Sequence, residues 1–412
     1  MKQKENRGET IFTRNFTFLL LGQVFSLLGN GALRFALSMY VLEKTGSAAV
    51  FGTLLAVSMV PTVLLTPFGG VLADRVNRRK IMVGLDLTSG AVVLAAAAAF
   101  SDSRGIAVTA VLLIILSVLG AFESPTVQAC VPQMLSGDNV LRGNAAVNQA
   151  NAVSGLVTPF LGSLLYTAFG VRPVLAGAGV CFLLTAALER FIRLPEMAPG
   201  GKQSLGEILR EDLLGSARFL ARERREVLEL LLFSAAVGSL IAGVAVVGLP
   251  YLIRTALGLS ARMYGAAESA IGLAALLGGL AAGLLAGRLA FRRLNWLVAG
   301  VGICVLLGGA ALVMPVGVMG QYAVLVLLFC AGQAAACTFS IFAVSAIQQK
   351  TPESMTGKVM ACVSAISVCA QPLGQLIYGV WFDVSPGWLV LAVSGIVVLL
   401  CGVLSGRLFD KW

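Results

Sequence analysis

Long apolar runs alternate with short polar interruptions along almost the whole chain. Twelve runs reach about 20 residues, the length with which an α-helix crosses the hydrocarbon core of a bilayer. Because backbone groups in lipid must be hydrogen-bonded within their own segment, each run is predicted to be a helix. The predicted spans are 16–42, 48–72, 80–100, 105–128, 143–168, 172–193, 228–252, 262–287, 294–315, 321–347, 357–382 and 387–408. The pattern therefore predicts an all-α polytopic membrane protein with twelve transmembrane helices.

The only long polar interruption, 194–227, divides the predicted spans into two sets of six. It begins with prolines and glycines and continues as a charged amphipathic stretch from Ser204 to Glu226. This pattern predicts a six-helix bundle at 1–193, a cytoplasmic linker with an amphipathic helix at 194–227, and a second six-helix bundle at 228–412.

The two predicted bundles are similar at a constant offset of 213 residues. Three pairs align without gaps: Ser47–Gly52 with Ser260–Gly265, Gly70–Lys80 with Gly283–Arg293, and Pro159 with Pro372. Because six helices is an even number, both bundles enter and leave on the same side, which predicts parallel repeats around a central cavity. Such repeats favour transport by rocking of the bundles. A duplicated scaffold without a pathway is the alternative.

The charges predict how the chain is oriented. With the N-terminus in the cytoplasm, 24 of the 30 Lys and Arg residues face the cytoplasm, five face outside and Arg34 lies within a helix. In a soluble protein the net charge of +10 would suggest nucleic acid, but the positive-inside rule explains it here. We expect a multi-pass protein of the cell inner or plasma membrane with both termini cytoplasmic, surrounded by lipid and without a nucleic-acid partner.

Composition narrows the function classes further. Hydrophobic residues make up 58% and charged residues 12% of the 412 residues, whereas charged residues are roughly a quarter of a soluble domain. The chain has no histidine and no Walker pattern, and its eight cysteines lie in or beside apolar runs without a Cys-x-x-Cys pair. We therefore expect no enzyme activity, no metal site and no cofactor.

A short charged loop, Gly70–Lys80, carries the most specific motif. It contains the pattern Gly-x-x-x-Asp-Arg-x-x-Arg-Arg, formed by Gly70, Asp74, Arg75, Arg78 and Arg79. This pattern resembles the signature that follows helix 2 in the major facilitator superfamily, although Asn77 stands where that family usually has Gly. The resemblance covers the whole chain. It implies two six-helix bundles that transport by alternating access.

Further segments resemble the macrolide-efflux and multidrug branch of drug:proton antiporters within that superfamily. These segments are Gly22–Gly29, Ala121–Pro125 and Thr351–Met360. The antiporter signature of helix 5, Gly-x-x-x-Gly-Pro-x-x-Gly-Gly, is matched only in part, because Thr158 and Ser163 replace two of its glycines. Both replacements are small enough for close helix packing. The resemblance implies export.

Within the charged loop, Asp74 and its neighbouring arginines are predicted to form a cytoplasmic gate. Charge-assisted pairs would hold the bundles together until protonation or rocking breaks them. The alternative is that the cations only set topology, for which Asp74 is unnecessary. Gly287 replaces Asp74 in the second copy, which predicts a weaker gate there.

Four ionisable residues lie well inside predicted spans, away from the span ends, where they are costly and therefore suggest function. Without histidine, proton coupling needs a carboxylate, and Glu123, Asp86 and Glu268 are the candidates. Glu123 ranks first, because it precedes Pro125 on the fourth span, which the resemblance implies lines the cavity; a structural ion pair is its alternative. Asp86 fits the gate network better, and Glu268 could be an exposed rim charge. Arg34 could bind a carboxylate or an anionic substrate group.

Uncharged polar residues form two stripes at i, i+4 and i+7, a spacing that shares one helix face. One stripe is Asn144, Asn148 and Asn151, and the other is Gln371, Gln375 and Tyr378. The candidates for the substrate cavity are the stripe residues other than Asn144, together with Gln23, Asn30, Arg34 and Gln333. Hydrogen bonding between helices explains the stripes equally well.

Three functions follow from these patterns. The first is a monomeric, proton-driven exporter of small amphipathic compounds such as macrolides or other drugs. The second keeps the fold and changes the substrate to a lysophospholipid, siderophore or other metabolite. The third is a membrane sensor that binds a ligand without transporting it.

Overall fold

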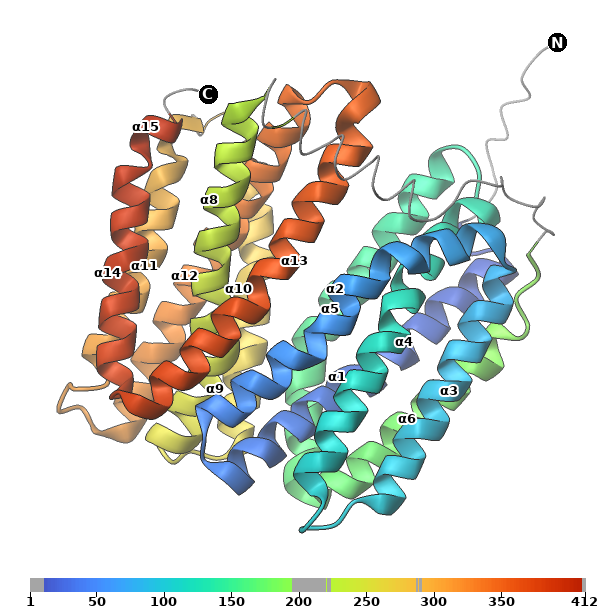
Figure 1. Ribbon diagram of the computed structural model, residues 1–412, viewed down its shortest axis with the longest axis horizontal. Helices are drawn as coiled ribbons and strands as arrows, with labels where there is room; N and C mark the ends of the chain where they lie inside the picture. The colour runs from blue at the N-terminus through green and yellow to red at the C-terminus, as the bar shows by residue number, and fades with distance from the viewer. Residues whose placement is uncertain (1–10, 195–219, 221–223, 287, 289–290, 410–412) are drawn as a thin grey trace. The chain divides into compact units, whose positions relative to one another are not determined.

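The computed structural model describes residues 11–194, 220, 224–286, 288 and 291–409. In these residues all regular structure is helical, and twelve helical segments are long and apolar enough to cross a membrane. The twelve predicted spans are confirmed, and several helices extend beyond the apolar runs that predicted them (Figure 1). The all-α membrane fold is therefore established.

The first six spans are single helices. They are α1 (Arg14–Thr45), α2 (Ala48–Arg75), α3 (Arg78–Ala99), α4 (Gly105–Met134), α5 (Asp138–Phe169) and α6 (Val171–Glu189). The predicted linker, 194–227, lies mostly outside the described residues, as does most of its amphipathic stretch.

The seventh span is continuous but changes its helix type three times. It consists of α8 (Arg225–Ala242), the π-helical η1 (Gly243–Gly248), α9 (Leu249–Tyr251) and the π-helical η2 (Leu252–Ala256). The remaining elements are α10 (Ala261–Leu285), η3 (Phe291–Arg293), α11 (Leu294–Ala311), α12 (Gly317–Lys350), α13 (Glu353–Val384), α14 (Gly387–Leu404) and the short α15 (Gly406–Phe409).

The chain forms two compact units whose limits differ from the predicted bundles. Among the described residues, the first unit contains those up to 36 and those from 64 to 194, and the second contains 37–63 and those from 220 onward. The end of α1 and the start of α2 thus pack with the second unit, although they belong to the first six helices of the sequence. Helices α1 and α2 each contribute to both units.

Antiparallel packing of α3 and α6 organises part of the first unit. A Cβ atom on Gly179 would lie 2.7 Å from Leu94 Cγ, and one on Gly90 would lie 3.1 Å from the Gly179 carbonyl oxygen. Close contact of this kind is typical of helix pairs in lipid, where small residues let backbones approach. This register places the start of α3 opposite the end of α6.

Helices α11 and α14 lie side by side in the second unit (Figure 1), and glycines have the same role between them. Cβ atoms on Gly302, Gly395 and Gly402 would approach backbone nitrogens of the facing helix to 2.3–2.4 Å. Backbone cannot move aside as a side chain can, so alanine at these positions would force the helices apart.

The repeat is visible in local structure. Ser47 caps α2, accepting a hydrogen bond from Val50 N at 3.1 Å, and Ser260 caps α10, accepting from Met263 N at 3.4 Å. Pro159 lies inside α5, and Pro372 lies inside α13. The residues that align in sequence therefore have equivalent positions in their helices.

Candidate functional site

A polar pocket of about 670 Å³ lies within the first unit, between α1, α4 and α5. Nine of its 14 lining residues are polar: Gln23, Ser26, Asn30, Glu123, Ser124, Gln128, Asn144, Asn148 and Asn151. Five of the residues predicted for the substrate cavity or the proton site, together with Asn144, therefore meet in one place. The spacing of the three asparagines on α5 put them on the face that lines this pocket.

Glu123 is the one carboxylate among the residues that line this pocket. Its Oε1 accepts a hydrogen bond from Ser26 Oγ at 3.2 Å. Ser26 is 5% exposed, and Gln23, one turn earlier on α1, is 7% exposed. The Nε2 group of Gln23 has no hydrogen-bond partner among the described residues. The pocket thus combines an acidic group with an unused amide donor.

Two amides that line this pocket, those of Asn30 and Asn151, already have hydrogen-bond partners. Arg34 is exposed and donates from Nε to Asn30 Oδ1 at 3.2 Å. Asn151 donates from Nδ2 to the Val147 carbonyl oxygen at 3.0 Å. Arg34 therefore contacts an amide on its own helix, and Glu123 is held by a serine.

A second acidic site lies deeper in the first unit, where α3 faces α6. Asp86 and Glu189 are each 1% exposed and lie close enough to interact electrostatically. Both oxygens of Asp86 and Oε2 of Glu189 lack a hydrogen-bond partner in the described part of the chain. Burying a polar atom without a partner is costly, so this pair of carboxyl groups is an unusual feature of the contact between α3 and α6.

Glu189 was not among the predicted site residues. It lies within the predicted span 172–193, in the last turn and next to Arg190, where a charge resembles an ordinary helix-end residue. Asp86 was assigned to the gate network on the basis of its closeness to the charged loop in sequence. The structure places its side chain against α6.

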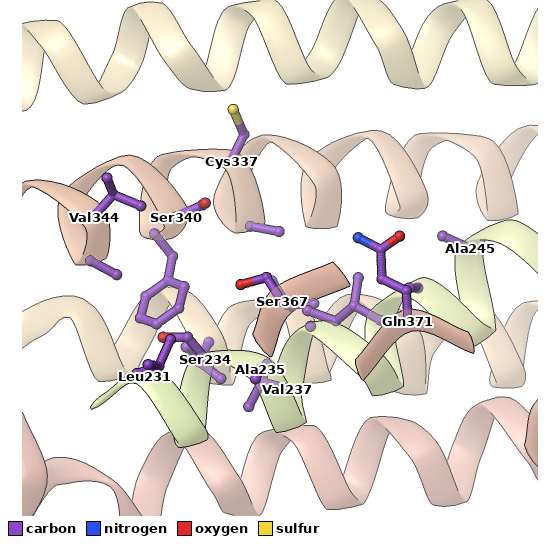
Figure 2. Close-up of a pocket in the computed structure, with 18 of the residues that line it drawn as sticks. Leu231, Ser234, Ala235, Val237, Ala245, Cys337, Ser340, Val344, Ser367 and Gln371 are labelled. Atoms are coloured by element: carbon purple, nitrogen blue, oxygen red, sulfur yellow. The ribbon is translucent and has the colours of Figure 1, made fainter. Parts of the chain in front are cut away.

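A pocket of about 500 Å³ lies within the second unit. It is lined by α8, η1, α11, α12 and α13, and most of its 22 lining residues are apolar. Gln333 and Gln371, two of the predicted cavity residues, line it. Figure 2 shows the Gln371 amide and the Ser367 hydroxyl pointing into the space between the helices. No charged residue is among those lining it.

The stripe on α13 separates into three environments. Gln371 lines the pocket, whereas Gln375 is 4% exposed and donates from Nε2 to Met59 Sδ at 3.5 Å. Tyr378 is 1% exposed and donates from its hydroxyl to Ser394 Oγ on α14 at 2.8 Å. In this structure Gln375 and Tyr378 make helix-to-helix contacts.

Glu268, the third carboxylate candidate, lies on α10 in the second unit. The Tyr264 hydroxyl, one turn earlier on the same helix, hydrogen-bonds to its side chain. Glu268 is not among the residues that line either pocket described above.

The charged loop connects α2 to α3 and is held by backbone acceptors. Arg78 is 8% exposed and donates to the carbonyl oxygens of Ala73 and Ala129, both at 2.8 Å. Arg79 donates to the Ile192 carbonyl oxygen at 3.3 Å. Arg78 therefore ties the ends of α2 and α4 to the start of α3, while Arg75 is exposed and the side chain of Asp74 lies outside those described.

Two neighbours explain details of this motif. Asn77 caps α3, because its side chain accepts a hydrogen bond from Lys80 N at 3.4 Å. The family usually has Gly at this position, so the Asn found here has a structural role of its own. A Cβ atom on Gly69 would lie 2.4 Å from the Ala121 carbonyl oxygen, whereas one on Gly70 would meet nothing within 4 Å. The close contact between α2 and α4 thus depends on Gly69.

A sequence model of the Major Facilitator Superfamily matches residues 19–366. The chain belongs to this superfamily. Superfamily membership makes it a membrane transporter with a small-molecule substrate, not an enzyme, which confirms the sequence prediction.

Two curated superfamily relatives are exporters by name. Macrolide efflux protein A of Streptococcus pyogenes is 26% identical over 220 residues, which are 53% of each chain. The match thus spans about half the length of that relative. Enterobactin exporter EntS of Shigella flexneri is 26% identical over 403 residues, covering 94% of this chain and 90% of that one.

Solved structures of other superfamily members share the fold. The nucleoside transporter NupG aligns with a TM-score of 0.74 at 12% identity, covering 97% of this chain and 100% of that chain. A bacterial homologue of the iron transporter ferroportin in an inward-facing state aligns with a TM-score of 0.69 at 18% identity, covering 97% and 98%. At these identities the likeness shows the fold alone. The described residues contain no group of three or more Cys, Asp or Glu side chains suited to holding a metal ion.

Proposed function

We propose that this protein is a proton-coupled exporter of amphipathic organic compounds, including macrolide-like molecules. It acts as a monomer in the cell inner or plasma membrane, with both termini in the cytoplasm. The observation that carries this proposal is the pocket of the first unit, where Glu123 is the one carboxylate among otherwise neutral polar side chains. A carboxylate can exchange a proton for a cationic or hydrogen-bonding group of the substrate.

The arrangement around Glu123 supports a reversible role. A permanent ion pair would neutralise the carboxylate, but the partner found here is the neutral hydroxyl of Ser26. The uncharged amides around it offer donors and acceptors to hydroxyl, carbonyl and amine groups of a ligand. A pocket of this composition accommodates either a proton or a polar ligand group at the carboxylate.

Similarity to a macrolide efflux protein and to a siderophore exporter supports outward transport. The match to the enterobactin exporter covers far more of this chain than the match to the macrolide efflux protein does. A siderophore or another defined metabolite is therefore the second candidate substrate. The predominance of Lys and Arg in the predicted cytoplasmic segments supports the orientation.

Purified protein in sealed vesicles tests the proposal. An imposed pH gradient should drive flux of at least one compound from a panel that includes macrolides and enterobactin. Glu123→Gln, which keeps the shape and removes the titratable group, should abolish this dependence on the gradient. Glu268→Gln is the matched control, because Glu268 is also a carboxylate in a membrane helix but lines neither pocket.

The outcomes separate the candidates. Flux of macrolides and of unrelated amphipathic drugs supports the first substrate class, and flux of enterobactin alone supports the second. Saturable binding without flux under any gradient would show a sensor instead. Gradient-driven flux that Glu123→Gln leaves intact would refute the assignment of the proton to Glu123.

A further inference from the structure

The first turn of α2 is capped from the other end of the chain. In any α-helix the first N–H groups lack partners within the helix. Here Phe51 N donates to the Ser47 carbonyl oxygen at 3.3 Å, and Val50 N donates to Ser47 Oγ at 3.1 Å. The N–H groups of Ala48 and Ala49 remain, and both donate to the carboxylate of Asp383.

Asp383 lies in the last turn of α13 and uses both of its oxygens. Oδ1 accepts from Ala48 N at 2.6 Å, and Oδ2 accepts from Ala49 N at 3.2 Å and from the Ser47 hydroxyl. A carboxylate at a helix N-terminus is stabilised by the exposed N–H groups and by the helix dipole. One side chain thus completes the cap of a helix more than 300 positions away in sequence.

The helices also touch through their backbones next to this cap. A Cβ atom on Gly379 would lie 2.9 Å from the Ala48 carbonyl oxygen, and one on Gly52 would lie 2.5 Å from the Gln375 carbonyl oxygen. Further along α2, Met59 Sδ accepts from Gln375 Nε2. The contact between α2 and α13 therefore extends over about three turns of α2.

An ion pair lies on the other side of the α1–α2 turn. Arg254 in η2 binds Glu43 near the end of α1, and its Nη1 donates to the Leu259 carbonyl oxygen at 2.6 Å. All of these residues belong to the second unit, since that unit includes 37–63. The α1–α2 turn is thus held by α13 on one side and by the seventh span on the other.

We propose that Asp383, assisted by the Arg254–Glu43 pair, forms a releasable latch that closes the extracytoplasmic end of the transport pathway on the α1–α2 turn. The proposal rests on the transport function and orientation proposed above. When the latch opens, the Ala48 and Ala49 N–H groups can donate to water at the membrane surface instead of to Asp383. Opening is therefore possible, but it costs the interaction of these groups with the carboxylate. The glycines supply a contact that can separate without unlocking interdigitated side chains.

Labelling of a buried cysteine tests the latch without any substrate. In a background with the eight native cysteines replaced, Gln375→Cys places a smaller side chain at a position that is 4% exposed against α2. A membrane-impermeant maleimide added from outside should label Cys at 375 slowly. Asp383→Asn should accelerate labelling about tenfold, as expected from losing a charged acceptor at a helix N-terminus.

Controls make this measurement decisive. Asp383→Glu keeps the charge and should label at an intermediate rate, and Asp102→Asn, in the α3–α4 turn, should leave the rate unchanged. Thermal unfolding in detergent identifies any variant that is misfolded. A folded Asp383→Asn protein with an unchanged labelling rate would overturn the latch, whether or not any compound is transported.

Cross-linking supplies the second test. In the cysteine-free background, Ser47→Cys with Asp383→Cys should form a disulfide on oxidation, stop flux, and recover flux when reduced. Each single variant should transport equally well with and without oxidant. Undiminished flux through fully cross-linked protein would refute the latch, whereas absence of flux in every sample would count against the proposed function instead.

Discussion

The two pockets differ more than their origin in repeated sequence would suggest. The pocket of the first unit has nine polar residues among 14, including Glu123, whereas the pocket of the second unit has five serine and glutamine side chains among 22 and no charge among its lining residues. The two sets of helices share a repeated sequence pattern, but the side chains that line their pockets differ. Under the proposed function, this difference assigns proton coupling to the first unit and an apolar substrate surface to the second.

Moving the carboxylate between the pockets is the strongest test of this contrast. We expect Glu123→Gln to lower gradient-driven flux about 100-fold, a typical contribution of a general acid or base. Adding Gln371→Glu should not restore it, because the second pocket lacks the serine and amide surroundings of Glu123. Flux measurements in vesicles test this prediction. Restored coupling in the variant that carries both substitutions would show that the position of the carboxylate is unimportant.

The Asp86–Glu189 pair should affect stability more than substrate choice. Asp86→Asn supplies an amide donor to Glu189, so the unfolding temperature should change little. Asp86→Leu removes the partner and should destabilise the fold by about 1–3 kcal/mol, the cost of a buried polar group left unsatisfied. Thermal unfolding of the purified protein measures both variants. Equal destabilisation by Asn and Leu would mean that no hydrogen bond between the side chains at positions 86 and 189 stabilises the fold.

Filling the apolar pocket should alter substrate affinity and leave coupling intact. Val344 lines the second pocket, and Val344→Trp would occupy part of its volume of about 500 Å³. We expect the KM for a large substrate to rise about tenfold while flux remains dependent on the pH gradient, since binding is lost uniformly. Val393→Trp, an exposed position on α14 outside this pocket, is the control. A loss of gradient dependence would contradict the division between the units.

The smallest effect is expected at Ser26. Ser26→Ala removes the hydrogen bond to Glu123 Oε1 but leaves the carboxylate in place. Flux should fall about threefold to tenfold, in line with a net hydrogen-bond contribution of about 0.5–1.5 kcal/mol. Ser26→Thr keeps the hydroxyl and should retain more activity than Ser26→Ala. Identical flux in both variants would show that the hydroxyl does not position Glu123.

The helices and part of the first pocket could be predicted because they depend on local patterns. Apolar length determines a membrane span, and three asparagines at helical spacing on α5 must share a face. Glu123 was found because a carboxylate inside an apolar run is conspicuous. These features require no knowledge of which helices are neighbours.

The rest depends on contacts between distant segments. Glu189 and Asp383 both lie at helix ends, where a charged residue looks like an ordinary boundary signal. Their roles appear only when α6 meets α3 and α13 meets α2. Gln371, Gln375 and Tyr378 share a helix face as predicted, yet three different neighbours determine what each side chain touches.

The π-helical turns of the seventh span have a mechanical consequence. A π turn contains i→i+5 hydrogen bonds and holds an additional residue compared with an α turn. Converting η2 into regular α-helix would rotate the residues beyond the change by about 100° around the helix axis. Arg254 lies within η2, so we expect such a change in hydrogen bonding to move its guanidinium group relative to Glu43. The additional residues in the π-helical turns of the seventh span thus allow a local change in backbone hydrogen bonding to rotate a side chain without bending the helix.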